Sequence, residues 1–111
     1  MESQPVFGTS EEYHTWKLLN GTLSPKMLNS ITSKIRKGGQ VHPAILISLV
    51  NALKETTEVT ATELTILSEK ARPQDISPIM RIAEILIEMD EMSAAQSIIT
   101  TSESRDSFYR L

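Results

Sequence analysis

An almost continuous apolar run near residue 80 constrains the fold more than any other feature of this sequence. The three polar exceptions between residues 79 and 89 fall on one narrow stripe of a helix, Arg81, Glu84 and Glu88. Ser77 and Pro78 precede the run. A serine hydroxyl can accept a hydrogen bond from a free N–H at a helix start, and proline fits the first helical position, where no N–H is needed. We therefore predict a helix over residues 79–89, capped by Ser77 and buried on most sides.

A second apolar segment follows this core helix. Asp90 and Glu91 interrupt the run, and the apolar pattern resumes at Met92, Ala94, Ala95, Ile98 and Ile99. Alanines at these positions allow two helices to approach closely, so we expect a helical hairpin that ends near Thr101.

Start and stop signals bound four further helices, from Thr9 or Ser10 to Leu19 and over residues 25–37, 43–54 and 61–71. Proline follows a polar residue at two starts, Ser24-Pro25 and His42-Pro43, and threonine with glutamate three residues later resembles a capping box at Thr9 and Thr60. The stops are Asn20-Gly21, Gly38-Gly39 and Pro73. The run 44–50 alone could also be a buried strand, but no partner strand exists elsewhere, so helix is favoured.

The fold class is therefore all-α. We expect a compact bundle of about six short helices, with the helices near 43–54 and 78–89 as the buried pair. Residues 1–8 form a flexible N-terminal arm in which Phe7 could pack locally, residues 9–103 a single domain, and residues 104–111 a C-terminal tail without a helical repeat.

The chain lacks the features of secreted, membrane and cofactor-binding proteins. It has no cysteine, no apolar run near the roughly 18 residues of a membrane span, and no glycine-rich phosphate loop. We expect an intracellular, cytoplasmic and soluble protein without a cofactor.

Catalysis is not expected. Only His14 and His42 could serve as a general base, and the sequence places His14 on a surface face and His42 at a helix cap. Glu84 and Glu88 could face a metal ion, but no histidine motif accompanies them, so we interpret them as a structural polar stripe.

Charge divides sharply along the chain. The segment from Tyr13 to Lys54 holds six basic residues and no acidic one. Residues 55–111 hold eleven acidic and five basic residues. Four of the bases lie on the polar face of the helix over 25–37: Lys26, Lys34, Arg36 and Lys37. They could bind phosphates of a nucleic acid, an acidic protein segment or anionic lipid, or serve only as a solvated face.

The C-terminal tail is a second candidate for partner binding. Phe108, Tyr109 and Leu111 make it apolar and aromatic. Such a tail could add as a strand to a receptor groove, or fold back and cover Trp16.

Our first hypothesis is a noncatalytic protein-interaction or assembly module that binds a partner protein, or itself, through a groove between helices. The alternative is a nucleic-acid-associated accessory protein that uses the basic helix over 25–37. No small-molecule substrate is expected.

Overall fold

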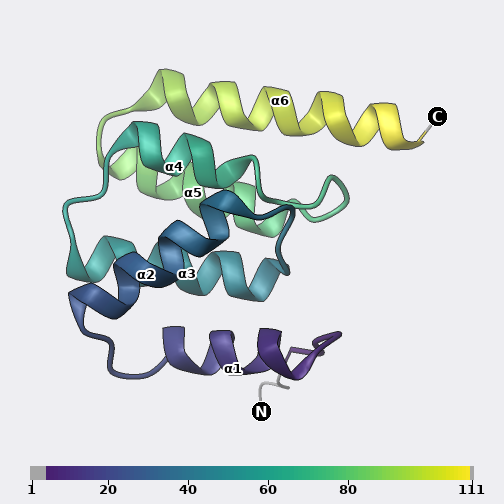
Figure 1. Ribbon diagram of the computed structural model, residues 1–111. Coiled ribbons are helices and arrows are strands. Elements are labelled where there is room, and N and C mark those ends of the chain that lie inside the picture. The colour runs from purple at the N-terminus through teal and green to yellow at the C-terminus, as the bar shows by residue number, and fades with distance from the viewer. Residues whose placement is uncertain (1–4, 111) are drawn as a thin grey trace, which may run out of the picture.

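The computed structural model describes the backbone of residues 5–110 and the side chains of residues 5–104. This part of the chain forms six helices and no strand: α1 (Ser10–Leu19), α2 (Pro25–Lys37), α3 (Pro43–Thr56), α4 (Ala61–Ser68), α5 (Ser77–Glu88) and α6 (Met92–Arg110). Figure 1 shows α1 and α6 on opposite sides of the molecule, with the other four helices between them. The all-α bundle predicted from the sequence is confirmed.

Most of the predicted start signals form the expected caps. Thr9 and Glu12 make both hydrogen bonds of a capping box at α1, and the hydroxyls of Ser24 and Thr60 accept backbone N–H groups of α2 and α4. The imidazole of His42 caps α3, because its Nδ1 accepts from the Ala44 N–H at 3.1 Å. The bounds of α2 are those predicted, and α3 runs two residues further, to Thr56.

Three local predictions were wrong. Ser77 does not cap α5, because Ile76 before it already has helical angles and Ser77 lies inside the first turn. The helix α4 ends at Ser68 rather than Ala71, since the N–H groups of residues 69–71 bond three residues back, which tightens the chain into turns. Finally, α6 does not end near Thr101 but continues to Arg110.

The core is aliphatic and centres on α3 and α5. Leu46, Leu49, Ile82 and Leu86 are fully shielded from solvent, and α4 and α6 add Leu64, Leu67, Ala95 and Ile98. The predicted buried pair is confirmed by the packing of α3 against α5. Among the described residues, no helix has both the length and the apolar character needed to cross a membrane.

The polar stripe of α5 is structural, as predicted. Arg81 donates from Nε to the Asn51 side chain of α3 at 2.6 Å and from Nη1 to Glu84 at 2.9 Å. Glu88 forms a salt bridge with Lys54, one turn beyond Asn51 on α3, and the ammonium of Lys54 lowers the pKa of the Glu88 carboxyl. These contacts fix the register of α3 against α5.

A left-handed residue joins α5 to α6. Asp90 has φ 61°, the Asp90 N–H bonds to the Ile87 carbonyl at 3.0 Å, and the Glu91 N–H bonds to the Leu86 carbonyl at 2.8 Å. This is the hydrogen-bond pattern of a Schellman cap, which usually has glycine at the left-handed position.

Replacing Asp90 by glycine should stabilise the protein. An L-residue other than glycine costs about 1 kcal/mol in the left-handed region, and the greater freedom of glycine in the unfolded chain cancels part of the gain. We expect Asp90→Gly to raise the free energy of unfolding by about 0.5 kcal/mol in urea titrations. A clear loss of stability would show that the Asp90 side chain contributes more than its backbone strain costs.

Truncating the core helix should destabilise the bundle strongly. Leu86→Ala removes a fully buried side chain and should lower the free energy of unfolding by about 2–5 kcal/mol. Met80→Ala is the matched control, because Met80 lies on the same helix but is 46% exposed. Equal losses in the two variants would contradict the assigned buried face of α5.

Candidate interaction groove

A groove opens between α1 and α2. Both helices pack on α3, and α2 runs diagonally across it, so that its C-terminal half diverges from the N-terminal half of α1 (Figure 1). The groove encloses about 560 Å³ and is closed at one end by residues 38–42. Its apolar lining comes from three helices and a loop: Leu18, Ile31, Ile35, Val41 and Ile45.

One salt bridge crosses this groove. Lys34 Nζ on α2 lies 2.9 Å from Glu11 Oε1 on α1, and both side chains are about three-quarters exposed, at 78% and 74%. The Lys34 ammonium lowers the pKa of the Glu11 carboxyl, chiefly by donating this hydrogen bond and also through its charge. Such exposed pairs fix geometry more than they add stability, and salt screens them.

An aromatic cluster packs against His42, one of the residues that line the groove. Phe7 lies 4.5 Å from the His42 ring, 5.7 Å from the Trp16 ring and 6.2 Å from the Tyr13 ring, measured between centroids. His42 also joins residues 5–8 to α3, because its Nε2 lies 2.8 Å from the Val6 carbonyl oxygen. Since Nδ1 accepts the Ala44 N–H, Nε2 is the protonated nitrogen and donates to Val6. The local packing of Phe7 considered from the sequence is therefore present.

The four predicted basic residues do not form one patch. Lys34 faces α1 and pairs with Glu11, whereas Arg36 and Lys37 line a separate hollow on the side of α4. Lys26 lies at the other end of α2 and is exposed. The sequence correctly placed all four on the polar face, but periodicity within one helix could not show which neighbours that face meets.

The predicted tail site falls on α6. The backbone of Phe108 and Tyr109 belongs to this helix rather than to an irregular tail, and their side chains and Leu111 lie outside the described part of the structure. Figure 1 places the C-terminal end of α6 on the side of the molecule away from α1. Among the described residues, the rings of Phe7 and Tyr13 contact Trp16.

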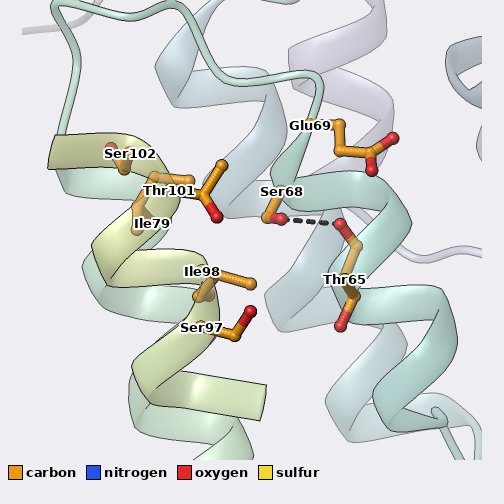
Figure 2. Close-up of a pocket in the computed structure, with 8 residues that line it drawn as sticks. All are labelled: Thr65, Ser68, Glu69, Ile79, Ser97, Ile98, Thr101 and Ser102. Carbon is orange, nitrogen blue, oxygen red and sulfur yellow. Dashed lines mark hydrogen bonds between the residues drawn. The ribbon is translucent and has the colours of Figure 1, made fainter. Parts of the chain in front are cut away.

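A smaller hollow lies between α4, α5 and α6 (Figure 2). It encloses about 200 Å³, and most of its lining residues carry a hydroxyl: Thr65, Ser68, Ser97, Thr101 and Ser102. The Ser68 hydroxyl donates to the Thr65 carbonyl oxygen at 2.6 Å. Glu69 is its one charged lining residue, and neither His14 nor His42 lines it, so no histidine base is placed to activate a hydroxyl there.

No cluster of three or more potential metal ligands occurs among the described residues. Glu84, one of the two glutamates considered as ligands, is bound to Arg81, and Glu88 is bound to Lys54.

The comparisons with known proteins found no family model that matches the chain, and no curated protein or solved structure that matches it.

The sequence-based hypothesis named a groove between helices but could not say which helices form it. Sequence patterns predict each helix separately. The groove arises because α1 and α2 both pack on α3 without packing closely on each other. The one available signal was the pair Gly38-Gly39, which separates α2 from α3 and leaves an open loop beside the groove.

The pKa of Glu11 offers a direct test of the bridge across the groove. A folded pKa below the unfolded value of about 4.3 means that the pair stabilises the fold above that pH, and that this contribution is lost as the pH falls through the lowered pKa. In carboxyl NMR titrations, Lys34→Gln should return the pKa of Glu11 toward its ordinary value, as should high salt. Lys26→Gln is the control, and an equal shift in that variant would contradict a specific contact with Lys34.

Proposed function

We propose that this chain is a noncatalytic helical interaction module that binds an amphipathic helix of a partner protein in the groove between α1 and α2. The observation that carries the proposal is the apolar lining of an open groove on a domain whose core is otherwise closed. A sizeable apolar cavity open to solvent is a common mark of a binding surface.

The walls of the groove favour a helical occupant. The backbone N–H and C=O groups of α1 and α2 are largely bonded within their own helices, and the described residues include no strand edge. An extended peptide would therefore leave its backbone groups unpaired against these walls, whereas a helix satisfies its own. The α1 wall from Thr9 to Leu18 spans about 14 Å, which suits two to three helical turns.

The charges at the rim suggest how the partner helix is oriented. Glu11 and Lys34 line the α1 and α2 sides of the groove and bond to each other across it, so a bound helix has to open this exposed salt bridge. A partner helix with basic residues along one flank and acidic residues along the other would complement this rim. Its apolar face would carry anchors at the i, i+3 or i+4, and i+7 spacing.

Gly39 provides a way to block the groove without disturbing the fold. It lines the groove, its φ is not positive, and an added Cβ would meet nothing within 4 Å. Gly21 is the control: it also lies in an exposed loop, its added Cβ would make only ordinary van der Waals contacts, and it does not line the groove.

Selection from a library of displayed 15-residue peptides tests this proposal. We expect the selected peptides to share apolar residues at helical spacing. Gly39→Leu should weaken their binding by at least about tenfold, because the new side chain would displace one apolar anchor of the peptide. Gly21→Leu should leave the binding unchanged. Light scattering behind size exclusion would show whether a second copy of the chain fills the groove. In that case the protein would be a dimer, and Gly39→Leu would make it a monomer. Selected peptides that bind both variants equally would contradict the groove as the site.

The alternative role as a nucleic-acid accessory is supported by Lys26, Arg36 and Lys37, which have no acidic partner within 4 Å among the described residues. Against it, Lys34 is already paired with Glu11. If the chain binds RNA or DNA through this face, affinity for a mixed oligonucleotide pool should fall steeply as salt rises, since counterion release drives such binding. Binding that does not respond to salt would contradict this role.

A further inference from the structure

The hollow between α2 and α4 gathers unneutralised positive charge. It encloses about 350 Å³ and is lined by Ser33, Arg36 and Lys37 of α2 and by Ile66 of α4. Arg36 and Lys37 follow Ser33 by three and four residues, so the hydroxyl and the two cationic groups lie on neighbouring positions of one helix surface. The Ile66 side chain supplies an apolar wall.

Several other basic side chains of the described structure are already engaged by partners. Three form salt bridges with glutamates: Lys34 with Glu11, Lys54 with Glu88 and Arg81 with Glu84. Lys17 lies over the Tyr13 ring. Arg36 and Lys37 have no acidic partner within 4 Å among the described residues, and neither Glu63 of α4 nor Glu69, which follows that helix, lines the hollow.

The frame of the hollow is held by contacts between the ends of α2 and α4. Lys70 Nζ donates to the Gly38 carbonyl oxygen at 2.8 Å, and the Val41 N–H donates to the Lys70 carbonyl oxygen at 2.9 Å. The Lys70 ammonium also offsets the partial negative charge at the C-terminus of α2, which would otherwise disfavour an anion beside Arg36 and Lys37.

We propose that this hollow binds a phosphate monoester on a partner protein, a phosphorylated serine or threonine, through Arg36, Lys37 and Ser33. Such a group is close to doubly charged at neutral pH and presents three acceptor oxygens. The guanidinium of Arg36 can donate two parallel hydrogen bonds, Lys37 adds a compact positive charge and Ser33 adds a neutral donor. Ile66 contacts the aliphatic carbon beside the ester oxygen.

A phosphorylated side chain fits this hollow better than a nucleic acid does. Two free cations match one dianionic group, whereas a backbone of single charges calls for a row of cations along its path. The described aromatic rings near α2 form the cluster around Phe7, and none lines this hollow to stack on a base. The hollow also shares no lining residue with the α1–α2 groove, so the two proposals can fail separately.

NMR titration at constant ionic strength tests the proposal with a five-residue peptide that carries one phosphoserine between valines. We expect amide shifts at residues 33, 36, 37 and 66, and no binding of the unphosphorylated twin. Arg36→Gln combined with Lys37→Gln should weaken binding at least about tenfold, because charged hydrogen bonds are lost. Lys26→Gln, an exposed base on the same helix, should change affinity less than about twofold.

Further variants and competing ligands in the same titration identify the source of the phosphate. Ile66→Thr should weaken the phosphopeptide more than inorganic phosphate, and Gly39→Leu in the groove should alter neither. The proposal is overturned if inorganic phosphate binds as tightly as the peptide, if Lys26→Gln costs as much as the double variant, or if a ten-nucleotide RNA displaces the peptide at equal phosphate concentration.

Discussion

Burial of α5 on three sides is the constraint on which the rest of this structure depends. Its buried face meets α3, α4 and α6, and residues such as Ile82 and Leu86 lose all contact with solvent. The polar stripe of α5 lies at the edge of this core, where Arg81 and Glu88 bind side chains of α3. Aliphatic packing thus sets the position of α5, and the polar contacts set its register.

Both candidate binding sites lie at the edge of this core. Helices α3 to α6 close around one another, whereas α1 and α2 are supported mainly by α3. Two helices that share a support but diverge from each other leave a groove, and the residues that follow α2 and α4 join beside a hollow between these two helices. Helices α3 to α6 therefore carry most of the buried residues, whereas α1 and α2 border the groove and the hollow.

Sequence patterns predicted the helices best where a cap and a buried face coincide. The signals Ser24-Pro25 and Gly38-Gly39 predicted both ends of α2 correctly. The Ser24 hydroxyl caps this helix, and the buried Leu28 and Ile35 lie on its predicted apolar face. The extension of α6 was missed because periodicity detects only helix that buries a face, and residues 103 and 104 are exposed. A groove between helices was hypothesised, but which helices form the groove and the hollow could not be predicted, since each depends on how helices distant in sequence are placed. Lys34 and Arg36 share a polar face, yet they meet different neighbours.

Native-state hydrogen exchange measures the central claim most directly. If α5 is the element around which the domain is built, the amides of α3 and α5 should exchange most slowly and with the free energy of global unfolding, whereas those of α1 should exchange through smaller, local openings. Amides in the middle of α5, such as Ile82 and Leu86, should give the highest protection. Faster exchange at these positions than in α1 would contradict the account, because it would show that the fold survives without α5 in place.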